Sequence, residues 1–354
     1  MASLAERCQS VLKRIIQSPS QTPSRVIIPH NHVDVGAEGL PFQPLEHYFQ
    51  VRINEMHLTN KRQWFSLFDP LVFVVSEFTY DKKMETVPFV VGPTMMEQFG
   101  KQIPTGMIFS DTRVAGLHPY RGGRINLSIV LCQLQRKNYA MELLHIVESL
   151  ATVLDFSTVL SSYMKVAEVM LDGVESLLGL GSTVPLIALR KEFDPDAGDR
   201  LEPTYFALID MPASQLDPKA LWVRDHQLFY GSSSAASTPF RSSDFVLYSI
   251  VQSSDRSDVT TLPFYPLYEQ VIQEAMKPDD VSWKSTKANM VALSQKMTLS
   301  PDLTPTQANK LSEQYVAEMV QKHNKAVDWS TLGPAKATSE IDKKLRQAVS
   351  ILDL

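Results

Sequence analysis

Hydrophobic residues recur at two different spacings along the chain, and changes between them divide it into segments. Residues 2–17 carry a single apolar stripe with steps of four, three and four, which predicts a short amphipathic helix. The members of the stripe are Leu4, Cys8, Val11 and Ile15. The next residues, SPSQTPS, contain two prolines and several hydroxyl side chains and predict a linker. Residues 1–24 are therefore expected to be an N-terminal helix and linker.

From residue 25 to residue 138 the spacing becomes that of strands. Six short runs rich in β-branched and aromatic residues are separated by Pro, Gly and Asn: RVIIP, YFQVRI, LVFVVSEF, VPFVVG, GMIF and INLSIVLCQL. In the last run Ile125, Leu127, Ile129 and Leu131 alternate with smaller or more polar residues, as a half-buried strand requires. Six such runs predict an antiparallel β-sandwich or a partly open barrel.

Residues 139–278 combine two patterns. Residues 139–180 are strongly apolar at helical spacing, although charged residues interrupt the surface, and they predict a core helix or a helical hairpin. A second group of strand-like runs follows: VPLIALR, TYFALIDM, ALWVRDHQLFY and DFVLYSIV. We therefore expect a helical block joined to a second β-rich domain.

Residues 279–354 are polar and predict helices. Thr304 and Pro305 suit the cap and the first turn of one helix. A last helix is expected at about 338–352, with the stripe Ile341, Leu345, Ala348 and Leu352. The fold class predicted is α+β, with an N-terminal antiparallel β-sandwich, a central apolar helical block, a second β-rich portion and peripheral terminal helices.

Residues 48–91 place a strand and a loop before Asp69-Pro70 and a further β-run, FDPLVFVV. This order resembles the opening of the calcium- and phospholipid-binding β-sandwich modules of protein kinase C and synaptotagmin. The resemblance implies a sandwich fold. Those modules bind calcium through several loop aspartates, whereas only Asp69 stands at a matching position here, which argues against calcium-dependent lipid binding. We expect Asp69 to be a turn residue.

Composition narrows the possible environments and partners. The 354 residues are 44% hydrophobic and 21% charged, as in an ordinary globular protein of about two domains. The two cysteines predict reduced thiols, and neither a secretory signal nor a membrane span is visible, so we expect a soluble cytoplasmic protein. A formal net charge of -5 supplies no overall attraction to nucleic acid, and none is expected as a partner.

The strongest metal-like pattern is PHNHVD, directly after the first strand-like run. Two histidines two residues apart at a strand end face the same side, as in many metallohydrolases. A catalytic metal needs a further ligand from elsewhere, and the other histidines form no second pair of this kind. We therefore predict that His30, His32 and Asp34 form a polar loop and hold no metal, with a metal site as the alternative.

An acidic segment, DPDAGD at 194–199, resembles a calcium loop. Its glycine falls one position early, and Tyr205 stands where the last ligand, a glutamate, is needed. A solvated acidic turn is the better interpretation.

The most informative polar segment is DTRVAGLHPYRGGR, residues 111–124. Guanidinium groups suit carboxylates and phosphates, and glycines expose backbone N–H donors. The candidate anion- or partner-binding residues are Arg113, His118, Tyr120, Arg121 and Arg124. The alternative is structural, with arginines paired to nearby acids such as Asp111.

No nucleophile elbow, phosphate-binding loop, dinucleotide fingerprint or C-x-x-C motif occurs, and no cofactor is expected. The leading hypothesis is a non-enzymatic interaction protein, an adaptor or structural subunit. It acts through a protein partner or self-assembly, and the striped terminal helices dock either on their own domain or on a neighbouring chain. One alternative is a hydrolase, possibly metal-dependent through His30 and His32. Another is an effector whose helices at 139–180 rearrange to act on a membrane.

Overall fold

A computed structural model describes residues 3–16, 23–34, 40–59, 62–63, 66–92, 107–135, 160–179 and 183–331. The chain divides into two compact units, residues 1–258 and 259–354. The fold is α+β, and each unit is described by itself.

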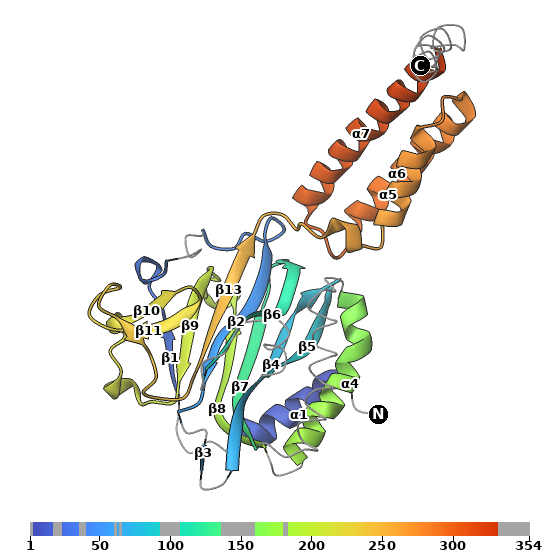
Figure 1. Cartoon of the computed structure of the whole chain (residues 1–354). Coiled ribbons are helices and arrows are strands. Elements are labelled where there is room, and N and C mark those ends of the chain that lie inside the picture. Colours follow the sequence, from blue (N-terminus) through green and yellow to red (C-terminus); the bar gives the residue numbers. More distant parts are fainter. Residues whose placement is uncertain are drawn as a thin grey trace, which may run out of the picture. The chain divides into compact units, whose positions relative to one another are not determined.

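Two antiparallel sheets stack on each other in the first unit, and a third, smaller sheet packs on the outside (Figure 1). The first sheet contains, in spatial order, β1 (Ser24–Ile27), β9 (Thr204–Ile209), β13 (Phe245–Ser253), β2 (Tyr48–His57) and β6 (Met107–Pro119). The second contains β5 (Lys83–Val91), β4 (Ser66–Tyr80), β7 (Ile125–Gln135) and β8 (Thr183–Phe193), with β3 (Arg62–Gln63) also paired to β4. The small sheet contains β10 (Leu221–Arg224), β11 (Gln227–Tyr230) and β12 (Thr238–Pro239).

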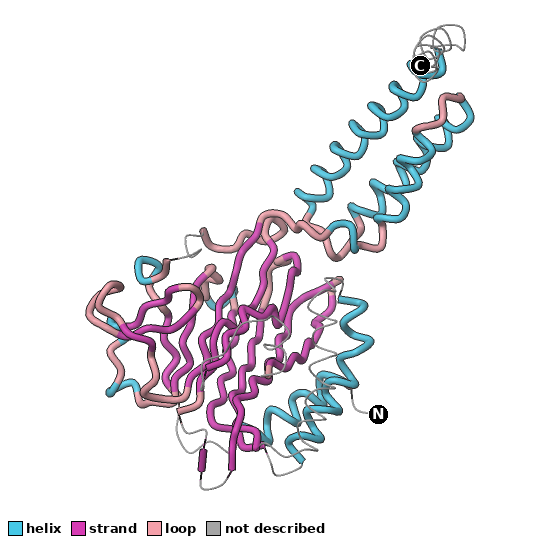
Figure 2. The backbone as a smooth tube through the Cα atoms, in the orientation of Figure 1, coloured by secondary structure: helices cyan, strands magenta, loops and turns pink. Residues whose placement is uncertain are grey.

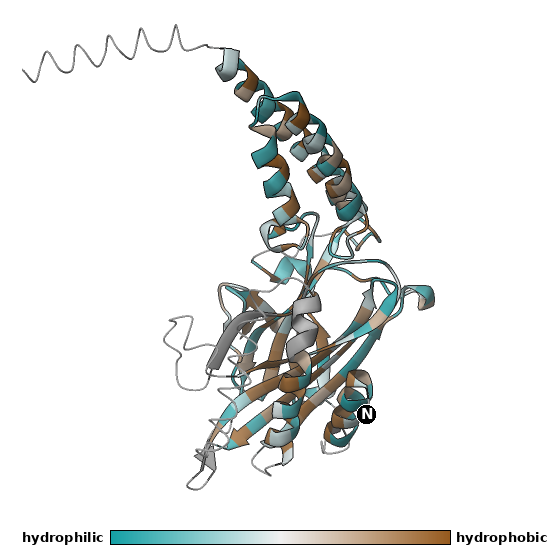
Figure 3. Ribbon diagram, turned by 90° about the vertical axis from the view of Figure 1, so that its right-hand side faces the viewer, coloured by the Kyte–Doolittle hydropathy of each residue, from teal (hydrophilic) through white to brown (hydrophobic). Residues whose placement is uncertain are grey.

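The two middle strands of the second sheet, β4 and β7, are largely buried on both faces, whereas its edge strand β8 is partly exposed. The outer face of this sheet is covered by the helices α1 (Leu4–Ile16) and α4 (Leu160–Gly179), which lie side by side (Figure 2). Its inner face packs on the first sheet in one continuous apolar core, so the strands are largely brown in Figure 3. Strands buried on both faces need no alternation. The half-buried strand expected at Ile125–Leu131 is therefore wrong, because Ser128, Val130 and Cys132 are buried too.

Residues from both predicted β-rich portions share these sheets. Strand β8 completes the second sheet, and β9 and β13 lie inside the first. The expected boundary between residues 138 and 139 therefore does not separate compact units. The chain divides after Asp258 and not after 278, so α5 (Tyr265–Ala275) belongs with the later helices.

Asp69 and Pro70 lie inside β4, paired with Leu134 and Gln133 of β7. Asp69 is buried and is not the turn residue expected from the sequence. The described pairing of β4 with β5 begins at Val72, so at Pro70 the described neighbour of β4 is β7 alone. Proline lacks an N–H, and a strand tolerates it best where one of its sides is not paired.

The predicted N-terminal helix is confirmed as α1, and its stripe faces the unit's own core. Ser3 and Glu6 cap it reciprocally: the Ser3 amide donates to Glu6 Oε2 at 2.7 Å, and the Glu6 amide donates to Ser3 Oγ at 3.2 Å. Arg7 joins it to α4 through Asp172 at 2.6 Å and Glu175 at 2.8 Å. Of the stripe residues, Cys8, Val11 and Ile15 are buried and Leu4 is half-buried; Leu12, which the stripe did not include, is buried as well.

A carboxylate is buried between the first sheet and the small sheet. Glu55 on β2 accepts a hydrogen bond from the Leu228 amide at 2.7 Å, and its Oε1 lies 3.0 Å from Nη2 of Arg241. Burial raises the pKa of Glu55 to about 7, and the Arg241 charge and the Leu228 amide oppose this rise.

Within its described residues, 259–331, the second unit contains the α-helices α5, α6 (Asp280–Thr298) and α7 (Pro305–Thr331). The predicted start of α7 is confirmed, since Pro305 is its first residue and Thr304 Oγ1 accepts from the Gln307 amide at 3.2 Å. The helix expected at 338–352 lies outside the described residues.

Substituting Val11→Ala tests whether α1 is held within its own unit. Val11 is fully buried, so we expect the free energy of unfolding to fall by about 2 kcal/mol with no change in mass in solution. Val169→Ala on the exposed side of α4 is the matched control and should change stability little. A lower assembly mass at unchanged stability would instead place the stripe of α1 between chains.

Substituting Glu55→Gln tests the buried carboxylate. Because its folded pKa lies above the ordinary value of 4.5, the stability it contributes is complete below pH 4.5 and is lost as the pH rises through 7. We expect the wild type to lose up to about 3 kcal/mol relative to the variant between pH 4.5 and pH 8, measured by urea unfolding. A stability difference that is constant over this range would contradict the raised pKa.

Candidate functional site

An apolar hollow lies beside the last turns of α7. This α7 groove has a volume of about 540 Å³. Its lining residues are Met276, Pro278, Lys322, Lys325, Ala326, Trp329 and Ser330.

The groove exists because α7 is longer than the helix beside it. An α-helix rises 1.5 Å per residue, so the 27 residues of α7 span about 40 Å and the 11 residues of α5 about 16 Å. Tyr268 of α5 stacks on Tyr315 of α7, with ring centroids 3.9 Å apart. The end of α5 is fixed by His323, whose Nδ1 lies 3.3 Å from the carbonyl oxygen of Ala275. The last turns of α7 therefore run past α5.

The inward-facing stripe of α7 continues into this uncovered part. Its first members, Ala308, Leu311, Tyr315 and Met319, are buried. The same three- and four-residue steps lead on to Lys322, Ala326 and Trp329. Trp329 is 77% exposed and Met276 is 49% exposed, so the groove presents two large apolar side chains to solvent.

The charge of the groove is positive. Among the described lining residues Lys322 and Lys325 are the charged ones, and neither makes an ion pair with another described residue. The neighbouring His323 is stacked on Trp283 at 3.9 Å and holds α7 against the start of α6. The groove thus combines a rigid apolar floor with a basic rim.

The sequence-predicted metal candidates do not converge. His30 and His32 lie in a 3₁₀ turn, not at a strand end. The His32 ring stacks on Trp222 at 3.8 Å, and its Nδ1 lies 2.9 Å from the carbonyl oxygen of Leu221. Asp34 accepts a hydrogen bond from the Asp225 amide at 3.0 Å. Within the described part of the chain, no group of three or more His, Cys, Asp or Glu side chains is arranged to hold a metal ion.

Most of the arginine-rich segment is strand and not loop. Residues 107–119 form β6, and only 120–124 connect it to β7. His118 is buried and stacks on Phe78, with ring centroids 4.6 Å apart. Tyr120 is buried as well, its ring edge-on to Phe42, and burial raises its pKa.

The structure describes the three arginines of this segment to different extents. Arg113 stands on β6 opposite Arg52, and its side chain lies outside the described residues. Arg121 is half-buried. Arg124 pairs with Asp194 at 2.9 Å and Glu192 at 3.4 Å, which ties the β6–β7 connection to the acidic turn. Structural contacts thus account for His118, Tyr120 and Arg124.

The central helical block is described only in part. Residues 139–159 lie outside the described residues, and α4 buries Ala167, Met170, Leu171, Val174 and Leu177 in the core. No helix among the described residues is long and apolar enough to cross a membrane. Both cysteine thiols are buried, and burial raises the pKa of each to about 12.

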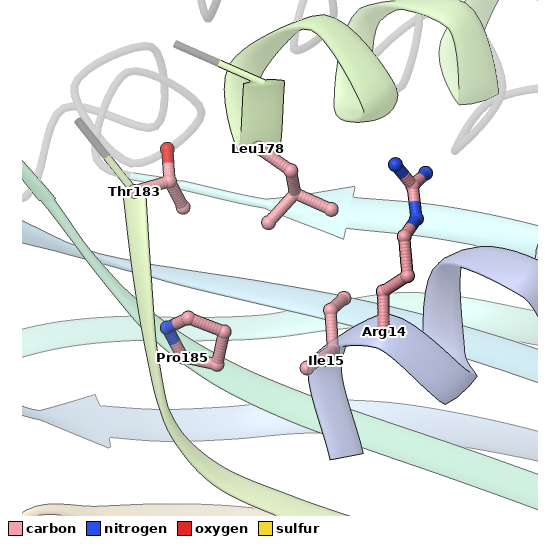
Figure 4. A pocket seen from close by; sticks show the side chains of 5 residues that line it. All are labelled: Arg14, Ile15, Leu178, Thr183 and Pro185. Carbon is pink, nitrogen blue, oxygen red and sulfur yellow. The ribbon is translucent and has the colours of Figure 1, made fainter. Parts of the chain in front are cut away.

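A smaller hollow of about 230 Å³ lies where the ends of α1 and α4 approach the start of β8. Figure 4 shows Ile15 and Leu178 facing it from the two helices, with Thr183 and Pro185 on β8. We assign this hollow no function.

Comparison with protein-family models, with curated protein sequences and with solved structures finds no match to this chain.

The α7 groove was not predicted from the sequence. Its signal was present as a stripe from Ala308 to Trp329, but Lys322 interrupts the apolar pattern and hides its continuation. The open end of the stripe depends on where α5 stops, which is a property of the packed unit.

His118→Ala tests the structural interpretation of the arginine-rich segment. His118 is buried among aromatic rings, so we expect the free energy of unfolding to fall by about 2–4 kcal/mol. The double variant Arg121→Ala with Arg124→Ala should lose no more than about 1 kcal/mol, because the ion pairs of Arg124 are half-exposed. The reverse order of the two losses in thermal or urea unfolding would contradict this interpretation.

Proposed function

We propose that this chain is a non-enzymatic interaction protein that binds an acidic, amphipathic helical segment of a partner protein in the α7 groove. The observation that carries the proposal is the uncovered end of the α7 stripe, where Trp329 is exposed beside an apolar hollow. Tryptophan is enriched among the residues that dominate protein interfaces.

The shape of the groove favours a helix as the occupant. It continues the space that α5 fills along the first part of α7, so a helical segment placed beyond Ala275 meets the same stripe. Helices bind such grooves through apolar residues at i, i+3 or i+4, and i+7. Met276 and Ala326 offer the floor for these side chains.

The charge of the rim favours acidic flanking residues. Lys322 and Lys325 border the apolar floor, and opposite charge on the partner increases its association rate and fixes its register. The adaptor role that we propose would therefore use the α7 groove as its surface and an acidic amphipathic helix as its partner.

The test is a selection of helical peptides from a displayed library on the full chain, followed by fluorescence anisotropy with the selected peptides. We expect selected sequences to carry an apolar i, i+3 or i+4, i+7 stripe flanked by Asp or Glu. Trp329→Ala should weaken their binding at least tenfold, about 1.4 kcal/mol, because the largest apolar contact is lost. Lys325→Glu should weaken it several-fold, and less at high salt.

Two exposed positions at the other end of α6 provide matched controls. Leu299→Ala removes a large exposed apolar side chain and Lys296→Glu reverses a lysine charge, both away from the groove, and each should leave affinity within about twofold. Selected peptides that bind the Trp329→Ala variant and the wild type with equal affinity would contradict the proposal. A self-association that Trp329→Ala abolishes in sedimentation would also contradict it, because the occupant would then be a second copy of the chain.

A further inference from the structure

A second hollow lies in the first unit, at the edge where the two large sheets end. It has a volume of about 220 Å³ and is formed by β1, the end of β8, the acidic turn after it and β9. Strand β8 is the edge of the second sheet and contacts β9, whereas the first sheet continues one strand further to β1. Among the described residues, therefore, no strand lies above the inner face of β1. We call this hollow the Arg25 pocket.

Arg25 is fixed in this pocket by two interactions. Its guanidinium carbon lies 4.3 Å from the ring centroid of Phe206, and its Nε donates to the hydroxyl of Tyr248 at 3.0 Å. Phe206 and Tyr248 are themselves stacked, with centroids 4.9 Å apart. Both belong to the buried core, so the guanidinium stands on a rigid support.

The terminal nitrogens of Arg25 make no hydrogen bond with the described residues, although the charge of Asp199 acts on the guanidinium at longer range. A guanidinium that is stacked on a ring and anchored through Nε keeps the two N–H groups of its outer edge available to an oxyanion. The rotamer entropy that such a contact normally costs has been lost already on folding.

The other charges in the pocket leave an excess of cations. Lys191 is neutralised by Asp199 at 3.1 Å, and Asp199 also accepts from the Asp194 amide at 3.2 Å. Arg200 also lines the pocket, is exposed and makes no hydrogen bond or ion pair with the described residues. Glu202 is the one further carboxylate among the described lining residues, so three cations, Arg25, Lys191 and Arg200, line the pocket with two carboxylates.

We propose that the Arg25 pocket binds the phosphate group of a phosphate monoester, with Arg25 and Arg200 as its two charged contacts. Phosphate offers several oxygens to two guanidinium groups, and its charge exceeds that of a carboxylate. Ile27, which is 58% exposed beside the pocket, provides apolar contact for the organic part of the ester.

Isothermal titration calorimetry on the full chain tests the site with three probes: inorganic phosphate, glycerol 3-phosphate and a phosphoserine tripeptide. All titrations are made at one ionic strength set with chloride. We expect saturable binding of inorganic phosphate and tighter binding of one of the esters, which identifies a small metabolite or a modified peptide as the source of the phosphate. Failure of all three probes to bind would overturn the proposal.

Variants separate the pocket from general attraction of anions to the surface. Arg25→Gln and Arg200→Gln should each weaken phosphate binding about tenfold or more, since each removes charge-assisted hydrogen bonds. Arg200→Gln leaves the fold unchanged because the side chain is exposed, so its result stands if Arg25→Gln is unstable. Arg190→Gln is the matched control: it lies next to Lys191 on β8, is half-exposed and pairs with Glu77 at 3.7 Å. Equal loss in Arg190→Gln and Arg200→Gln would overturn the assignment.

The test is independent of the α7 groove. Trp329→Ala should bind inorganic phosphate as the wild type does, because the residue belongs to the other unit. The two proposals can therefore fail separately.

Discussion

Burial of the middle strands of the second sheet, β4 and β7, on both faces is the constraint on which the first unit depends. The run Leu71–Val75 of β4 is buried at every position, as is most of β7 beside it. Such strands have no face that tolerates water, so one side requires the first sheet and the other requires α1 and α4. Each Å² of buried apolar surface contributes about 25 cal/mol to the free energy of unfolding. Because a domain's net stability is small, losing either cover would cost more free energy than the unit has to spare. The stripe of α1 is thus part of this cover.

The same stacking determines where a pocket can form. The first sheet carries a fifth, short strand, β1, beyond the four long strands that face the second sheet. A polar residue at an inward position of β1 is therefore tolerated, and Arg25 occupies it. Its stacking on Phe206 and its bond to Tyr248 offset the cost of placing a charge beside the core. In the second unit a mismatch of helix lengths also leaves a hollow, because the inward stripe of α7 extends beyond the end of α5.

The sequence predicted the features that depend on local signals and missed those that depend on contacts between distant segments. The fold class, the helix at Leu4–Ile16 and the start of α7 at Pro305 follow from local signals: an apolar stripe and a cap. The half-buried strand at Ile125 was wrong because the second cover comes from helices distant in sequence. Asp69-Pro70 suggested a turn, but pairing with β7 carries β4 straight through it. The boundary at 138 was wrong because β8, β9 and β13 complete sheets begun earlier in the chain.

The candidate sites were harder to predict than the elements. The spacing of His30 and His32 suggested a metal site as an alternative, but the ring of His32 stacks on Trp222. The arginines of 111–124 gather in sequence, but Arg124 is held by acids that come seventy residues later. Arg25 and Arg200 are far apart in sequence and meet only at the sheet edge. A site made by the packing of distant segments leaves no motif in the sequence.

Both proposed surfaces are basic although the chain carries a net charge of -5, and the two facts are compatible. At physiological ionic strength the Debye length is about 8 Å, so a bound anion responds to the charges lining its pocket and little to the total. Net charge bears on attraction over longer distances and at low salt. Arg25 and Arg200 against Glu202, and Lys322 with Lys325 beside Trp329, are the local balances that decide binding. The exclusion of nucleic acid drawn from total charge therefore concerns long-range attraction, and it leaves the chemistry of each pocket to the side chains that form it.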